Sequence, residues 1–184
     1  MTTPNPNPTA LLVVAHPRPD SLTAEVARRT AERLRADGRT VDLLDLHAEG
    51  FDPRMTPADE PDWADPDKRY SAETLRHMDR VTAADRIVVV FPVWWFGLPA
   101  ILKGWFDRVW NHGFAYGPRD LSGKSMEWIA LAGQTARGYT ESGLDKVMET
   151  QLRVGISEYC GIKDTGFRIL YDSVDGAAAL LDEL

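Results

Sequence analysis

Two short, unbroken apolar runs constrain the fold of this chain more than any other feature. They are ALLVVA at residues 10–15 and IVVVF within residues 86–91. A strand that is buried on both faces has this continuous pattern, whereas a strand with one solvated face alternates polar and apolar residues. We therefore predict buried strands at both places, and further strands at residues 41–46, 126–132 and 167–171.

Segments with helical spacing of their apolar residues lie between these strands. We expect helices at residues 22–37, 71–84 and 142–158, and a further helix that opens at Pro99, where the missing N–H of proline costs nothing. Strands that alternate with helices imply an α/β fold, with a parallel sheet and helices on both faces. Ligands of such folds bind at the carboxyl ends of the strands. The loops after the first, third and fourth strands are therefore the candidate site.

Length and composition limit the classes of protein that the chain can belong to. Its 184 residues suit one domain, which we place at residues 10–184 after a disordered tail at residues 1–9. The net charge of −7 argues against a nucleic-acid-binding surface. A single cysteine, no signal-peptide pattern and no apolar run of bilayer length lead us to expect a cytoplasmic protein. We expect no metal site, because no metal-ligand motif occurs, and we expect Cys160 to be a buried thiol.

The loop after the first predicted strand, AHPRPDSLT at residues 15–23, precedes a helix. Free backbone N–H groups and the helix dipole make such a place an anion site, to which His16 and Arg18 add positive charge. A phosphate is the natural ligand. The alternative is that Asp20 or Ser21 merely caps the helix. The loop has no GxGxxG or GxxxxGK[ST] motif, which disfavours a Rossmann dinucleotide site and an NTPase.

Four of the six tryptophans lie between Phe91 and Trp110. On the helix after Pro99, Trp105, Phe106 and Trp110 fall on one wide apolar face, so we expect them in the core or in a subunit interface. The loop before Pro99 differs, because strand alternation cannot bury the adjacent side chains of residues 94–96. A planar, hydrogen-bonding, aromatic ligand suits these side chains and their backbone N–H groups.

Three stretches together resemble one family. FPVWWFGLPAILKGWFDRV, residues 91–109, resembles the signature of the NAD(P)H:quinone oxidoreductases of the DT-diaphorase type, in the flavodoxin-like superfamily. VVAHPRPDSLTAEVA, residues 13–27, resembles the flavin phosphate loop of that family. WNHGFAYG, residues 110–117, resembles the small bacterial members, which include flavin-dependent ancillary subunits of glutathione-gated potassium efflux systems.

The resemblance implies a flavodoxin-like three-layer sandwich, with a five-stranded parallel sheet in the order 2-1-3-4-5. It also implies a homodimer with a flavin at the interface, in which hydride passes from NAD(P)H to flavin N5 and then to a quinone in a ping-pong cycle. The alternative is a flavin-binding regulatory subunit of a potassium efflux system, which would have a membrane partner. A one-electron carrier like flavodoxin is a third interpretation, which the bulky aromatic loop disfavours.

Carried over position by position, the resemblance assigns flavin contacts to three loops. The matching residues are His16, Ser21, Leu22 and Thr23 at the phosphates, Pro92, Val93, Trp94, Trp95 and Phe96 along the isoalloxazine ring, and Ala132, Gly133 and Gln134 at its pyrimidine end. Backbone donors of Gly133 and Gln134 would stabilise the negative charge of the reduced ring. Tyr139 matches the active-site tyrosine, whose phenol would hydrogen-bond the quinone oxygen or help to move a proton.

The chain departs from the family pattern at three positions. The Gly-Gly pair of the family is Gly133-Gln134 here, and Trp94 replaces a common glutamine. The family has a histidine six positions after the active-site tyrosine, where this chain has Asp145. A carboxylate cannot supply the positive charge of an imidazolium, so the proton route must differ, and Asp145 becomes a candidate catalytic residue.

Residues 47–70 are polar, rich in proline and aspartate, and without a clear period, so we predict a long excursion. Loops of this length are uncommon unless they have a function. Its end, within DPDKRYSAET, resembles the segment that reaches the adenine half of FAD in FAD-binding members, with Arg69 and Tyr70 at the contacting positions. We therefore expect FAD, with FMN as the alternative, and NAD(P)H as co-substrate. The other interpretation of the excursion is a lid or a dimer arm.

Overall fold

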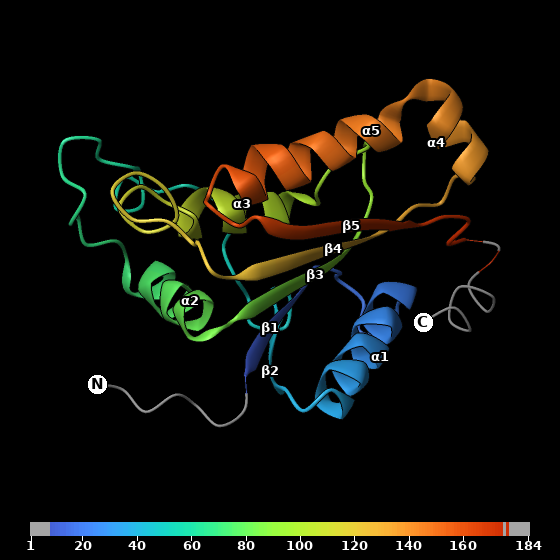
Figure 1. Ribbon diagram of the computed structural model, residues 1–184, viewed down its shortest axis with the longest axis horizontal. Helices are drawn as coiled ribbons and strands as arrows, with labels where there is room; N and C mark the ends of the chain where they lie inside the picture. Colours follow the sequence, from blue (N-terminus) through green and yellow to red (C-terminus); the bar gives the residue numbers. More distant parts are fainter. Residues whose placement is uncertain (1–7, 175, 177–184) are drawn as a thin grey trace.

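Five parallel strands form one sheet in the order β2-β1-β3-β4-β5, as the resemblance implied (Figure 1). The structure is a computed structural model that describes residues 8–174 and 176. The strands are β1 (Thr9–Val14), β2 (Thr40–Asp45), β3 (Arg86–Pro92), β4 (Ser125–Leu131) and β5 (Asp164–Leu170). Residues 1–7 of the expected tail lie outside the described residues. Thr9, which we had placed in the tail, is instead the first residue of β1, because it pairs with Thr40.

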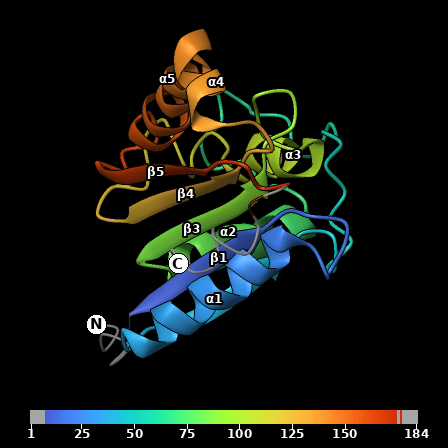
Figure 2. The same ribbon diagram turned by 90° about the vertical axis from the view of Figure 1, so that its right-hand side faces the viewer.

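Helices cover the two faces of the sheet unequally (Figure 2). They are α1 (Leu22–Ala36), α2 (Ala72–Ala83), α3 (Ala100–Val109), α4 (Ala136–Ser142), α5 (Leu144–Glu149) and the π-helix η1 (Thr150–Glu158). Buried residues of α1 pack with the side chains of β1, β3 and β4 that point to one face. Buried residues of α2, α3, α5 and η1 pack against the other face. The predicted three layers are therefore confirmed, with both faces of the sheet apolar.

The sequence prediction was wrong at the carboxyl side of β4. We expected a loop up to residue 142 and then one helix, but α4 begins at Ala136, capped by Thr135, whose hydroxyl accepts a hydrogen bond from the Gly138 N–H (3.2 Å). Gly143, with φ of 71°, separates α4 from α5. A seven-residue helix has too few turns to show a helical period, and only its cap marks it. β5 also begins at residue 164 rather than 167. The prediction missed its first three residues because they are not apolar.

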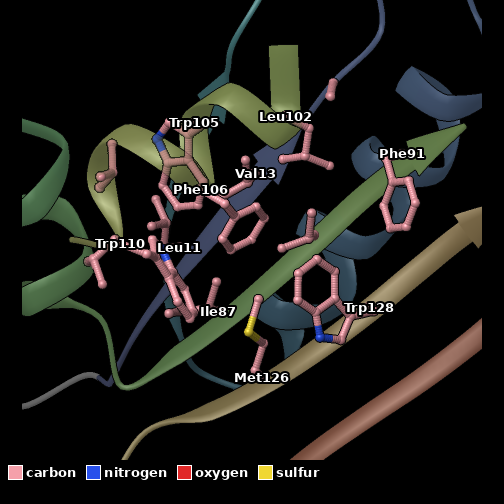
Figure 3. Packing of buried hydrophobic residues seen from close by; sticks show 14 of the residues in the cluster. Leu11, Val13, Ile87, Phe91, Leu102, Trp105, Phe106, Trp110, Met126 and Trp128 are labelled. Atoms are coloured by element: carbon pink, nitrogen blue, oxygen red, sulfur yellow. The ribbon is translucent and has the colours of Figure 1, made fainter. Parts of the chain in front are cut away.

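The aromatic face of α3 lies in the core, as expected (Figure 3). Trp105 is fully buried, and Phe106 and Trp110 are 5% exposed. Their rings meet edge to face, with centroids 5.0 Å apart for Trp105 and Phe106 and 4.9 Å apart for Phe106 and Trp110. Phe106 also contacts Trp128 of β4 at 5.1 Å. These contacts fix α3 on the sheet and thereby fix the start of α3, directly after the loop that follows β3.

The excursion at residues 47–70 contains no helix or strand, as predicted, and a buried ion pair holds it against α3. The guanidinium of Arg108 donates to Oδ2 of Asp59 (2.8 Å), and both side chains are almost inaccessible to solvent. The N–H of Ser71 donates to the other oxygen of this carboxylate (2.9 Å). Gly104 permits the close crossing, because a Cβ there would collide with the carbonyl group of Pro53.

The charge on Asp59 depends on these donors. Burial by itself would raise the pKa of the Asp59 carboxyl, but hydrogen bonds from Ser71 and Arg108 outweigh burial and hold that pKa below its usual range. A carboxyl whose pKa is lower in the folded state stabilises the fold above its unfolded pKa. This stability is lost as the pH falls through the folded pKa.

We expect Asp59→Asn to lower the free energy of unfolding at pH 7 by about 2 kcal/mol, because it removes the fully buried carboxylate that pairs with the Arg108 guanidinium. Only Glu73, a partly exposed carboxylate 2.9 Å from Arg108 Nη1, then remains to balance this charge. Denaturant unfolding measures this. The deficit should begin to shrink below the ordinary aspartate pKa of about 4 and should vanish only when the pH falls below the lower pKa of folded Asp59. Asp67→Asn is the matched control, since Asp67 pairs with Arg119 at an exposed surface (2.6 Å) and its loss should change little. Equal effects of the two variants would contradict the assigned role of Asp59.

Candidate functional site

The carboxyl ends of the strands bring the three predicted loops side by side. The N–H of Val93, after β3, donates to the carbonyl of Leu131 (2.8 Å). The N–H of Ala15, after β1, donates to the carbonyl of Val90 (3.3 Å). The rings of His16 and Trp94 lie 6.3 Å apart, which joins the first loop to the second. The loops that the sequence singled out therefore form one continuous edge of the molecule.

Ser21 is the N-cap of α1, as the alternative interpretation of this loop required. Its hydroxyl accepts a hydrogen bond from the N–H of Ala24 (3.2 Å). The cap leaves the first two N–H groups of the helix, those of Leu22 and Thr23, without a hydrogen-bond partner among residues 8–174. Capping and anion binding are thus compatible here, because each uses different donors at the same helix end.

His16 points its ring back to its own loop. Its Nδ1 lies 3.1 Å from the N atom and 3.3 Å from the O atom of Arg18, so these contacts fix the ring orientation. Partial burial, with the nearby charge of Arg18, lowers the pKa of His16. The imidazole is therefore neutral near pH 7, and its Nε2 remains for a ligand at the mouth of the loop.

The loop after β3 is a tight turn with a rare backbone conformation. The N–H of Trp94 donates to the carbonyl of Gly97 (3.3 Å), and the N–H of Gly97 donates back to the carbonyl of Trp94 (3.1 Å). The central residues, Trp95 and Phe96, have φ of 52° and 57°. Positive φ at both positions is the mark of a type I′ turn, which prefers Asn-Gly. Each aromatic residue held there stores about 1–3 kcal/mol of strain, and such strain gathers at functional sites.

The turn presents aromatic surface and backbone donors together. The side chain of Trp95 is 97% exposed and that of Trp94 is 44% exposed. The N–H groups of Trp95 and Phe96 have no hydrogen-bond partner in the described part of the chain. Pro92 is buried as the last residue of β3, and Val93 is half-buried beside it. A flat ligand with acceptor atoms would find both an apolar wall and unpaired donors here.

The loop after β4 offers a second pair of donors. Ala132 is buried, and the Gly133 and Gln134 residues that follow are exposed. The carbonyl groups of Ala132 and Gln134 accept hydrogen bonds from the N–H groups of Ser173 (3.0 Å) and Asp172 (3.1 Å), which fixes the loop. The N–H groups of Gly133 and Gln134 have no hydrogen-bond partner within residues 8–174.

Tyr139 lies on α4 rather than in a loop, and it is buried between two other aromatic rings. Its ring centroid is 5.6 Å from that of Phe96 and 5.4 Å from that of Tyr171. Burial raises the pKa of Tyr139, so its phenol stays protonated at neutral pH. Tyr171 directly follows β5, and we did not predict it as a site residue; it ends the FRILY run that marked the strand. The contact with Phe96 places Tyr139 beside the strained turn.

Asp145 lies in the first turn of α5, six residues after Tyr139. Its Oδ1 accepts a hydrogen bond from the N–H of Lys146 (2.8 Å). Burial raises the pKa of Tyr171, and the negative charge of Asp145 raises it further. No hydrogen bond joins Asp145 to Tyr139 among the described residues. A catalytic role for Asp145 remains a prediction.

The structure separates Arg69 and Tyr70 from the three loops within this chain. Tyr70 is buried, and its hydroxyl donates to the carbonyl of His112 (2.7 Å) on the excursion side of α3. Arg69 is exposed next to it. An adenine contact by these residues would thus need either a long reach or a second copy of the chain. Cys160, by contrast, is buried as predicted, and burial raises the pKa of its thiol to about 12.

A flavin fits the donors that the loops expose. Leu22 and Thr23 provide N–H groups for phosphate, and Trp95, Phe96, Gly133 and Gln134 provide N–H groups for a polar ring edge. The exposed tryptophans supply the apolar wall.

None of the helices in the described part of the chain is long and apolar enough to cross a bilayer.

Comparisons with known proteins agree with the five-stranded parallel fold described above. Residues 8–183 match the family model described as "Flavodoxin-like fold". The chain is 42% identical, over 89% of its length and 83% of the relative, to an uncharacterized NAD(P)H oxidoreductase of Escherichia coli. It is 33% identical, over 83% of its length and 77% of the relative, to the ribosyldihydronicotinamide dehydrogenase [quinone] of Rattus norvegicus.

A solved structure gives the same result for the fold. The NAD(P)H:quinone oxidoreductase from Methanothermobacter marburgensis superimposes with a TM-score of 0.87 at 24% sequence identity, covering 96% of this chain and 91% of that one. The strand order, the site at the carboxyl ends of the strands and the match along nearly the whole sequence lead to one conclusion. The chain belongs to the flavodoxin-like family.

Proposed function

We propose that this protein is a flavin-dependent NAD(P)H oxidoreductase that reduces quinones or related acceptors. One observation carries the proposal: three adjoining loops present backbone donors that are unpaired within the described part of the chain, beside two exposed tryptophans. The 42% and 33% identical relatives are named as an NAD(P)H oxidoreductase and a quinone dehydrogenase, which supports the same chemistry. A flavin supplies the hydride chemistry when bound, because it accepts a hydride from NAD(P)H and passes it on.

The residues of the chain have distinct parts in this proposal. The N–H groups of Leu22 and Thr23, with His16, would bind the phosphates. The N–H groups of Gly133 and Gln134 would hold the polar end of the ring and favour its anionic form, as donors of an oxyanion hole do. Trp95 would exclude water from one side and stack against the nicotinamide and the acceptor in turn.

Tyr139 would hold a proton near the acceptor. Its phenol is kept protonated by burial, and Phe96 and Tyr171 fix its ring from two sides. Such a phenol can donate a hydrogen bond to a quinone oxygen as negative charge develops there. This part of the proposal gives Tyr139 the role that the family resemblance implied and needs no imidazole at position 145.

Four expectations stay predictions. They are the homodimer with the flavin at its interface, the preference for FAD over FMN, the ping-pong order and the cytoplasmic location. The relatives reported above are named as oxidoreductases, so the regulatory-subunit alternative is not carried forward.

The first test is an absorption spectrum of the purified protein, followed by chromatography of any released cofactor. A flavin spectrum is expected, and the released compound will be FAD or FMN. A protein that stays colourless after incubation with either flavin, and that oxidises no NAD(P)H in the presence of quinones, would overturn the proposal.

Leu22→Pro tests the phosphate donors directly. Proline is accepted at the first position of a helix, so the variant removes the Leu22 N–H without breaking α1. We expect flavin affinity about tenfold lower than in Leu22→Ala, which loses the same side-chain packing but keeps the N–H. Fluorescence titration of the flavin-free protein measures this. Equal affinities of the two variants would remove Leu22 from the phosphate site.

Trp95→Asn separates strain from function. Asparagine tolerates the left-handed region, so we expect the free energy of unfolding to rise by about 1 kcal/mol. We expect kcat/KM for quinone reduction to fall by about tenfold, because the aromatic wall is lost. Trp95→Phe keeps an aromatic ring and should retain most activity. An active, stabilised asparagine variant would show that the turn is strained for another reason.

Tyr139→Phe should lower kcat/KM for the quinone by about a hundredfold and leave flavin content unchanged, because only the hydroxyl is lost. Burial raises the phenol pKa, so wild-type activity should not decline through this group until the pH exceeds the value for free tyrosine, about 10. The variant should lack that alkaline decline. Tyr171→Phe, which keeps its ring contact with Tyr139, is the matched control. Identical pH profiles for wild type and Tyr139→Phe would refute the role of the phenol.

A further inference from the structure

A second hollow lies on the α1 face, at the amino-terminal side of the sheet and so at the opposite end from the candidate site. Its volume is about 200 Å³. Four arginines line it: Arg33 of α1, Arg39 before β2, Arg86 at the start of β3 and Arg168 of β5. We refer to these residues and the space between them as the arginine hollow. Val88 and Ile129 form its apolar floor.

The arrangement of layers explains why charged side chains gather there. Alternate residues of β3 and β4 point to the α1 face, and those near the carboxyl ends are buried and apolar. Among the described residues, α1 is the only helix on this face (Figure 2). Arg86 and Glu127 point to the same face nearer the amino ends of β3 and β4. No helix among the described residues covers them fully, so these charged side chains stay partly exposed.

Positive charge exceeds negative charge in the arginine hollow. Even without Arg33, the guanidinium groups of Arg39, Arg86 and Arg168 outnumber the two carboxylates of the lining, those of Asp37 and Glu127, on a chain whose net charge is −7. Glu127 is shared, since its two oxygens lie 2.5 Å from Arg86 Nη2 and 3.5 Å from Arg168 Nη2. One carboxylate thus serves two guanidinium groups, and it cannot neutralise both.

Some side-chain donors of the arginine hollow have no partner among the described residues. The Nε atoms of Arg86 and Arg168 are buried and have no hydrogen-bond acceptor among the described residues. Arg39 is half-buried, and its side chain makes neither a hydrogen bond nor an ion pair with the described part of the chain. Unpaired donors are costly where water is excluded, and a bound anion would offset that cost.

We propose that the arginine hollow is a binding site for a compact phosphate-bearing anion of diphosphate size. Guanidinium groups match the oxygens of phosphate with two parallel hydrogen bonds, and arginine is the residue type favoured for such recognition. Arg39, Arg86 and Arg168 come from three separate segments of the chain, so the site would also link the starts of β2 and β3 to the interior of β5 when it is filled. The site is independent of the flavin and of the reaction proposed above.

Titration calorimetry of the protein as purified, with pyrophosphate as the probe, tests this proposal. We expect saturable binding that exceeds the effect of sodium chloride at the same ionic strength. Arg39→Gln and Arg168→Gln should each weaken binding about tenfold, because each removes charge-assisted hydrogen bonds. Arg54→Gln is the control, since Arg54 is an exposed arginine of the excursion. Arg168→Lys, which keeps the charge, should have an intermediate effect.

The outcomes separate this site from the flavin phosphate site. Loss of binding in Leu22→Pro, with full binding in Arg39→Gln, would place the anion at the start of α1 and overturn the proposal. Equal binding by all variants, or no binding beyond that of chloride, would overturn it too. Circular dichroism checks that each variant is folded, and Arg39→Gln is the safest in this respect because it breaks no ion pair with the described residues.

Discussion

The structure depends on the pairing of backbone groups in a sheet that is buried on both faces. Inside the sheet, every strand N–H must find a carbonyl partner, because no water reaches it. The pairing of β1, β3 and β4 ends at residues 14, 92 and 131, and there the backbone becomes free to bind something else. The N–H groups of Trp95, Phe96, Gly133 and Gln134 lie beyond these ends, and they have no hydrogen-bond partner among the described residues.

The same constraint explains how a strained turn persists. Trp95 and Phe96 occupy the left-handed region only because both ends of their turn are fixed. Val93 is tied to β4 on one side, and α3 begins just beyond on the other, with Trp105 and Phe106 anchored in the core. The ion pair between Asp59 and Arg108 holds the excursion across α3 and so helps to keep that helix in place. Core packing thus supports a surface conformation that the turn residues themselves disfavour.

Two ends of one sheet carry opposite chemistry. The carboxyl ends present neutral backbone donors beside aromatic rings, which suits a flat cofactor and its substrates. The amino-terminal side of the sheet on the α1 face presents more arginines than carboxylates, which suits a compact anion. A parallel sheet makes this division possible, because all strand starts lie at one edge and all strand ends at the other.

The sequence by itself determined the layers, the parallel sheet and the core face of α3, because continuous apolar runs and helical periods report burial directly. It also indicated the three loops of the candidate site, because they follow predicted strands. It did not reveal α4 or Tyr171. A seven-residue helix has no readable period, and a tyrosine at a strand end has no local mark of its neighbours. Only the tertiary structure placed Tyr139 between Phe96 and Tyr171, separated Arg69 from the other site residues, and brought Arg39, Arg86 and Arg168 together. These are contacts between segments far apart in the chain, and a single sequence carries no signal for such pairings.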